Sequence, residues 1–168
     1  MASIVSSFID SPKNNVIRTQ WDALTKLPGG KLIFSKLVGV AAAYTGTIGA
    51  RVQELREGFA RVTMADRPGV RNHLKSVHAV ALVNLAELTG NVALAYTLPA
   101  DARFIVAGLS IEYVKKSRGR ITATSECPVP TSNAKMEYAV PVVMKDDSGE
   151  VVATATLRTL VGPKKPKR

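Results

Sequence analysis

The chain has 168 residues, 46% of them hydrophobic and 21% charged, which is enough for one ordinary domain with a buried core and argues against wholesale disorder. Its single cysteine, Cys127, excludes an intramolecular disulfide and fits a reducing compartment, so we expect a cytoplasmic protein. The formal net charge of +10 would suit nucleic acid, anionic lipid or a polyanionic small molecule, but an aromatic content of 5% leaves few side chains to stack on single strands.

Two helices are expected first. Residues Pro12 to Leu27 predict a helix with Ile17, Trp21 and Leu24 on one face. A Pro-Gly-Gly run ends it, and residues Lys31 to Tyr44 predict a second helix.

The apolar part of that second helix is shorter than the about 20 residues that a membrane span needs, and a lysine interrupts it, so we expect no span. The first eight residues, uncharged and interrupted by serines, do not resemble a signal peptide.

A β-hairpin and a long helix follow. Apolar residues alternate over 48–53 and 60–64, with Glu57-Gly58 as the turn between them. A polar loop, Asp66 to Lys75, leads into a helix over Ser76 to Tyr96, whose 3,4 spacing predicts a buried face. That face comprises Ala81, Leu85, Leu88, Val92 and Ala95. Gly90 inside the helix indicates a close contact with another backbone.

Four strands are expected after the helix, with turns but no helix between them: Phe104 to Lys116, Arg120 to Cys127, Met136 to Lys145 and Glu150 to Leu160. Strands joined by short connections are antiparallel. The order predicts an α+β fold, an antiparallel sheet that covers one long helix. Pro141 within a strand predicts a sheet edge or a bulge. We expect a helical extension over 1–45, the main domain over 46–162 and a basic tail over 163–168.

Three polar residues stand out around the long helix. Asn72 precedes His78 by six residues, and Glu87 follows His78 by nine. Glu87 is the carboxylate of an otherwise apolar helix. A carboxylate is rarely found on such a helix unless it forms an ion pair or hydrogen bond, or has a function in binding or catalysis. It shares a polar stripe with Asn84 and Asn91, which could equally be a stripe that faces solvent or a subunit.

This spacing resembles that of the hotdog-fold acyl-CoA thioesterases, specifically the phenylacetate-degradation type and their uncharacterised relatives. The family pattern is an Asn, a His six residues on, a Gly-Gly pair, and an Asp or Glu nine residues beyond the His. The resemblance covers roughly residues 48–161 and implies the hotdog fold, in which a sheet wraps a central helix. One departure is that Ala79-Val80 stands in place of the Gly-Gly pair.

The resemblance implies hydrolysis of acyl-CoA thioesters at a site shared between two protomers of a homodimer or dimer of dimers. Asn72, His78 and Ala79 of one protomer would meet Glu87 of its mate, with Ser110 as a weaker match. The Ala79 N–H at the helix start would stabilise the oxyanion, and Glu87 would act as general base or as nucleophile. The added methyl groups of Ala79-Val80 would change the substrate or weaken catalysis.

Basic residues flank this region in two sets and could hold the phosphates of coenzyme A. They are Arg67, Arg71 and Lys75 beside the loop, and Lys115, Lys116 and Arg118 at a strand turn. Coenzyme A would be part of the substrate, so no separate cofactor is expected. Two histidines, His73 and His78, without a cluster of further ligands, give no metal-site spacing.

Two other functions remain open from the sequence. The first is a non-catalytic protein of the same fold that binds acyl-CoA or a fatty acyl group, which the Ala79-Val80 departure favours. The second is a basic nucleic-acid-binding protein, which the +10 charge favours but the low aromatic content and the absence of a recognisable motif argue against. We therefore expect an acyl-CoA partner and no nucleic acid.

Overall fold

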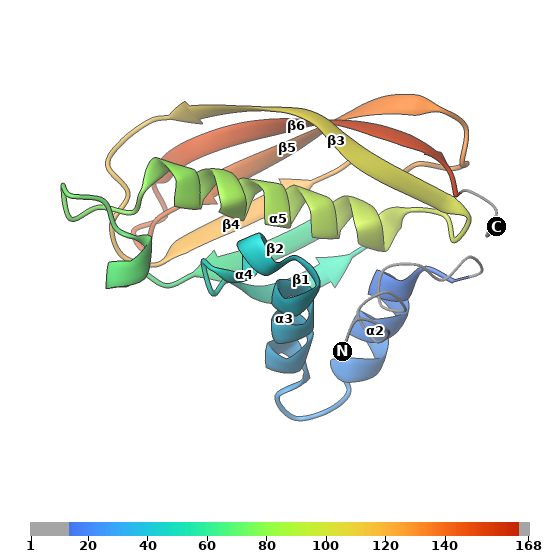
Figure 1. The fold of residues 1–168 in the computed structure, drawn as a ribbon, viewed down its shortest axis with the longest axis horizontal. Helices are drawn as coiled ribbons and strands as arrows, with labels where there is room; N and C mark the ends of the chain where they lie inside the picture. The colour runs from blue at the N-terminus through green and yellow to red at the C-terminus, as the bar shows by residue number, and fades with distance from the viewer. Residues whose placement is uncertain (1–13, 165–168) are drawn as a thin grey trace.

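The structure of the chain, a computed structural model, describes residues 14–164. Six antiparallel strands form one curved sheet in the order β1-β2-β4-β5-β6-β3, and helix α5 (Ala79–Thr97) lies within the curve (Figure 1). The strands are β1 (Arg51–Arg56), β2 (Phe59–Met64), β3 (Ala102–Tyr113), β4 (Ile121–Glu126), β5 (Met136–Lys145) and β6 (Val151–Pro163). The predicted α+β arrangement of a sheet around one long helix is confirmed.

Helix α5 is the centre of the core. Of its predicted buried face, Ala81, Leu85, Leu88 and Val92 are buried, and Ala95 is half-buried. Their partners in the core come from the inner face of the sheet and include Val62, Met64, Ile121, Val140 and Leu157. By length and composition α5 could cross a membrane, but 61% of that stretch is buried inside the fold. Its apolar character is therefore that of a core helix.

Gly90 allows α5 to lie close to the sheet. A Cβ atom on Gly90 would stand 2.9 Å from Leu157 Cδ2 and 3.2 Å from Val140 Cγ1. The predicted close contact exists, but it is made with side chains of β6 and β5 rather than with another backbone. This is a correction to the prediction.

Pro141 lies in an interior strand, at neither an edge nor a bulge, so that prediction is wrong. Strand β5 pairs with β4 only through residues 143–145, and Pro141 lies beyond the end of that ladder. The Ser125 hydroxyl donates to the Pro141 carbonyl at 2.7 Å. Because the N–H and C=O of a residue in an antiparallel strand point to the same side, the missing N–H of Pro141 faces a stretch where no ladder bond is needed.

The N-terminal helices are α2 (Val16–Leu24), α3 (Gly30–Ala41) and α4 (Ala43–Gly46), so the predicted second helix is divided in two. The predicted start of the first helix at Pro12 lies outside the described residues. The division occurs at Ala42, whose φ of −119° and ψ of 84° are not helical. The chain turns back there so closely that a Cβ on Gly46 would stand 2.6 Å from Gly39 O. Trp21 and Phe34 join α2 to α3 edge to face, with ring centroids 5.1 Å apart.

Helix α2 caps the end of α5. The side chain of Asn15 donates to the carbonyl oxygens of Ala95 and Leu98 at 2.8 and 2.9 Å. Arg18 Nε donates to the Tyr96 carbonyl at 2.8 Å. The last carbonyls of a helix have no partner within it, so these bonds satisfy groups that would otherwise need water. They also fix α2 across the C-terminal half of α5, where it lies in Figure 1.

Candidate active site at the start of α5

The start of α5 is held by two loops that are distant in sequence. Val77 N–H donates to the Ser117 carbonyl at 2.8 Å, and Gly119 N–H donates to Asp66 Oδ2 at 3.0 Å. Asp66 also forms an ion pair with Arg71 at 2.6 Å. The hydrogen bond from Arg71 lowers the pKa of Asp66 and in turn raises the pKa of Arg71. The predicted polar loop is therefore fixed against the turn that follows β3.

Asn72 holds the tip of this loop. Its Oδ1 accepts hydrogen bonds from Leu74 N–H at 2.9 Å and from Ser76 N–H and Oγ at 3.3 and 3.1 Å. Its Nδ2 donates no hydrogen bond within residues 14–164. The oxygen of Asn72 thus maintains the loop, and its amide nitrogen keeps two N–H donors that can reach a ligand.

His78 is the N-cap of α5. Its backbone is extended, and its Nδ1 accepts from Val80 N–H at 3.1 Å, so the ring satisfies one of the free donors of the first turn. The next residue, Ala79, is exposed, and its N–H has no acceptor in the described part of the chain. Its carbonyl accepts from the Tyr113 hydroxyl at 3.3 Å. Tyr113, which the sequence did not single out, steadies this turn, and burial raises its pKa.

Glu87 lies in the middle of α5 and is exposed, although its neighbours Ala86 and Leu88 are buried. No ion pair or hydrogen bond of its side chain forms within residues 14–164. Val80, Val83 and Glu87 belong to the part of the helix surface that neither the sheet nor the N-terminal helices bury completely. The carboxylate therefore stands on a face of α5 that is available to another molecule.

Glu87 and the start of α5 are not brought together within one protomer. Ala79 and Glu87 are eight residues apart, which is about 12 Å along the helix at about 1.5 Å per residue. His78, as the N-cap, lies outside the helix, so helical spacing does not decide where its ring points. The axial separation alone prevents Glu87 and the Ala79 N–H from acting on one carbonyl of the same protomer.

Ser110 is not brought to this region either. On β3, Leu109 and Ile111 pack against the core, and side chains alternate along a strand. Ser110 is exposed on the outer face of the sheet, opposite Thr156 of β6. The sheet therefore separates its hydroxyl from Glu87 in the same protomer.

The two sets of basic residues come together because the two loops do. Within them, Arg67 donates to the Thr47 carbonyl at 2.6 Å, Arg71 is paired with Asp66, and Lys115 forms ion pairs with Asp146 and Glu150. In the two sets, the exposed side chains with neither an ion pair nor a hydrogen bond within residues 14–164 are Lys75, Lys116 and Arg118. These three are the members of the sets best able to meet an anionic ligand.

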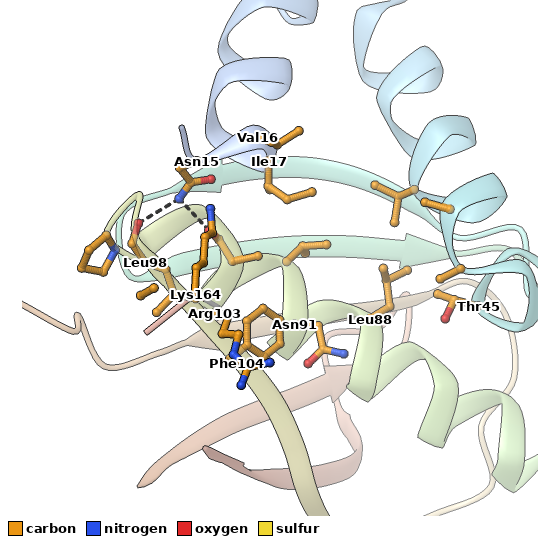
Figure 2. Close-up of a pocket in the computed structure, with 17 residues that line it drawn as sticks. Asn15, Val16, Ile17, Thr45, Leu88, Asn91, Leu98, Arg103, Phe104 and Lys164 are labelled. Atoms are coloured by element: carbon orange, nitrogen blue, oxygen red, sulfur yellow. Dashed lines mark hydrogen bonds between the residues drawn. The ribbon is translucent and has the colours of Figure 1, made fainter. Parts of the chain in front are cut away.

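The two asparagines of the polar stripe of α5 have different environments: Asn84 forms a structural hydrogen bond, and Asn91 lines a cavity. Asn84 donates to the Tyr44 carbonyl at 3.1 Å and so caps the end of α4. Asn91, one turn beyond Glu87, lines a cavity of about 340 Å³ between α2, α3, α5 and the start of β3 (Figure 2). Its Oδ1 is buried and accepts no hydrogen bond from the described residues, 14–164. The sequence placed Asn91 on the stripe but could not show this cavity, because the N-terminal helices form one wall of it.

The potential metal ligands and the single thiol were also considered as site residues. Within residues 14–164, His, Cys, Asp and Glu side chains form no group of three that could hold a metal ion. Cys127 is buried with its Sγ 3.8 Å from Thr97 Oγ1, and burial raises the pKa of its thiol. Cys127 packs in the core directly after the end of β4.

Residues 30–161 match the family described as Domain of unknown function (DUF4442). The chain belongs to this family. The matched region of the DUF4442 family includes α3 as well as the sheet and α5. No curated protein matches the sequence.

Several solved structures have the same fold as this chain. A protein from a genomics programme is 30% identical, with a TM-score of 0.76 over 88% of this chain and 99% of its own. A Pseudomonas aeruginosa protein described as a "Probable Thioesterase" is 24% identical, with a TM-score of 0.71 over 82% and 97%. A Haemophilus influenzae thioesterase is 15% identical, with a TM-score of 0.64 over 71% and 82%. The fold predicted from the resemblance, the hotdog fold, is confirmed.

Proposed function

We propose that this protein hydrolyses acyl-CoA thioesters at a site formed by two copies of the chain. The observation that carries the proposal is the exposed, unpaired Glu87 on a core helix whose first N–H, at Ala79, is also without a partner in residues 14–164. Proteins that share the fold are described as thioesterases, which supports the reaction class. The two groups are the base and the oxyanion donor that such a reaction needs.

Each group has one role in this reaction. The Glu87 carboxylate takes a proton from water as the water oxygen attacks the thioester carbonyl carbon. The carbonyl oxygen becomes negative and accepts a hydrogen bond from Ala79 N–H, aided by the positive end of the α5 dipole. The carbon–sulfur bond then breaks, and the thiolate takes the proton from Glu87. In the second route Glu87 attacks the carbonyl carbon, the thiolate leaves as the carbon–sulfur bond breaks, and water then hydrolyses the mixed anhydride to release the acid and restore Glu87.

Asn72 is proposed to position the substrate. Its oxygen is fully used by the loop, so its contribution comes from the Nδ2 donors. These can hold the thioester carbonyl or the attacking water. His78 contributes through its cap, which orders the first turn of α5, rather than through proton transfer.

A two-fold axis explains how separated groups can meet. If α5 of one protomer packs antiparallel against α5 of its partner, residues equally far from the axis come face to face. The midpoint between residues 79 and 87 is residue 83. Val83 is only partly buried, so an axis beside it is sterically open and would place Glu87 of one chain near Ala79 of the other.

The basic residues suit the coenzyme A part of the substrate. Lys75, Lys116 and Arg118 lie on the loops that surround the start of α5. Coenzyme A carries several phosphate charges, and lysine and arginine hold phosphates by charge-assisted hydrogen bonds. Arg67, Arg71 and Lys115 serve the loops through their own contacts, and the charges of Arg71 and Lys115 are balanced by the carboxylates they pair with.

Release of free thiol from a panel of short, medium, long and aryl acyl-CoAs tests this function. We expect turnover by the wild type and a loss of about 10²–10⁴-fold in Glu87→Gln, the usual contribution of a general base. Glu126→Gln is the matched control, because Glu126 is also exposed and has no ion pair within residues 14–164. No thiol release by the wild type, or full activity in Glu87→Gln, would contradict the proposal.

A non-catalytic acyl-CoA-binding function is the second candidate. Val80 is 49% exposed beside Ala79, so its side chain narrows the approach to the proposed oxyanion donor. A ligand could then bind without reaching the geometry for attack. In that case acyl-CoA would raise the melting temperature while releasing no thiol.

A further inference from the structure

The N-terminal helices and α5 border a partly open cavity of about 340 Å³. Figure 2 shows it bounded by α2 and α3 on one side and by α5 and the start of β3 on the other. Most of its lining is apolar and includes Val16, Ile17, Val38, Val92 and Phe104. The hydrogen bonds from α2 to the end of α5 hold its wall in place.

One end of the cavity adjoins the turn of α5 that carries Glu87. Leu88 follows Glu87 directly and Asn91 lies one turn further on, and both line the cavity. Thr45 lies opposite Leu88 at the same end in Figure 2. From this end the cavity follows α5 toward Leu98 and away from the start of the helix.

The lining has two polar features. Asn91 Oδ1 is buried there without a hydrogen-bond partner in residues 14–164, and a buried acceptor normally has one, so a donor such as an ordered water fits beside Asn91, near the Glu87 end of the cavity. Arg103 and Lys164 line the end remote from Glu87. An apolar chain that reached these two cations would have to displace their water, which is unfavourable.

We propose that this cavity holds the acyl chain of the substrate, with the thioester beside Glu87 and the chain directed toward α2. The inference rests on the proposed function and adds a substrate class, medium-length aliphatic acyl groups. At about 30 Å³ for each water-sized group, 340 Å³ holds on the order of ten methylene groups, which are similar in size. The two cations limit longer chains.

Filling the cavity tests the inference. Ala95 on α5 and Ala41 on α3 line opposite walls, so Ala95→Leu and Ala41→Leu each reduce the space without adding charge. Ala23→Leu is the control, because Ala23 is exposed on α2 and does not line the cavity. Thiol release is measured for saturated acyl-CoAs from four to sixteen carbons, and folding is checked by thermal melting.

We expect the wild type to prefer chains of about eight to twelve carbons. Either filling variant should lower kcat/KM for decanoyl-CoA at least tenfold relative to butyryl-CoA, and Ala23→Leu should keep the wild-type profile. An unchanged chain-length profile in a folded Ala95→Leu or Ala41→Leu protein would overturn the cavity assignment while leaving the hydrolase proposal standing.

A binding measurement separates the two proposals. Decanoic acid should raise the melting temperature of the wild type and of Ala23→Leu, but not of the filling variants. If it does so while no acyl-CoA is hydrolysed, the cavity assignment holds and the proposed function fails. If the wild type shows neither stabilisation by decanoic acid nor a preference among the acyl-CoAs, the cavity assignment is overturned.

Discussion

Asp66 and Arg71 anchor the loop that carries Asn72. Because of their ion pair, we expect the free energy of unfolding to depend on pH in the acid range. Because the folded-state pKa of Asp66 is lowered, its contribution to the free energy of unfolding is present above the ordinary value of 3.8 and is lost as pH falls through the folded-state pKa. We expect Asp66→Asn to lower stability at pH 7 by about 1 kcal/mol, or roughly 2–4 °C in melting temperature.

Melting curves of the wild type and Asp66→Asn at pH 7 and at successive values below pH 3.8 test this directly. The difference between the two proteins should shrink as the pH falls, because the wild-type carboxylate becomes protonated. Glu126→Gln, a change at an exposed acid, should show no such trend. A difference that stays constant down to acid pH would show that the ion pair does not stabilise the loop.

At the same scale, sequence spacing identified residues more readily than their roles. The interval between Asn72, His78 and Glu87 predicted a polar loop followed by a helix start, and the structure contains both, because such elements leave local signals. It could not show that Asn72 Oδ1 is consumed by the loop or that His78 acts as a cap, since both depend on how the backbone closes. The roles of Tyr113 and Asn15 depend on distant partners and had no local signal.

The packing of α5 against the sheet predicts the effect of a single methyl group at Gly90. An alanine there gains up to about 1 kcal/mol in helix propensity. However, its Cβ would lie 2.9 Å from Leu157 Cδ2 in a fully buried site, and overpacking costs about 1–3 kcal/mol. We expect Gly90→Ala to lower the free energy of unfolding by about 1 kcal/mol, measured by urea denaturation.

A double-mutant cycle identifies the cause. Leu157→Val shortens the side chain that the new methyl group would strike. The double variant should therefore be more stable than the sum of the two single changes predicts. A gain in stability in Gly90→Ala alone would mean that the helix has room to move away from β6.

Among the elements, those with strong periodicity were predictable and those set by tertiary contacts were not. Strand β5 has the predicted bounds, and α5 differs by three residues at its start and one at its end. The division of α3 from α4 had no signal in the local pattern, because it arises where Gly39 and Gly46 meet backbone to backbone. The prediction of an edge or bulge at Pro141 failed for a related reason. The point where the β4–β5 ladder ends depends on the pairing of the whole sheet and not on the local sequence.

At the scale of the whole molecule, the proposed reaction requires two copies of the chain. A single protomer offers Glu87 on one part of α5 and the oxyanion donor, Ala79 N–H, about 12 Å away along the axis. The predicted homodimer or dimer of dimers resolves that separation, and it stays a prediction.

The hotdog fold itself was predictable from sequence because helix and strand patterns and the Asn–His–Glu spacing all agreed. The partner arrangement leaves no comparable pattern within one chain.

Complementation between two inactive variants measures the shared site most directly. Glu87→Gln removes the base, whereas Asn72→Asp keeps the oxygen that holds the loop and removes the donor. In a mixed dimer of the two, one site contains wild-type Asn72 and wild-type Glu87 from different chains. After subunit exchange at equal amounts, statistical mixing predicts about a quarter of wild-type thiol release. If the mixture stays as inactive as its two components, the site is not shared between protomers.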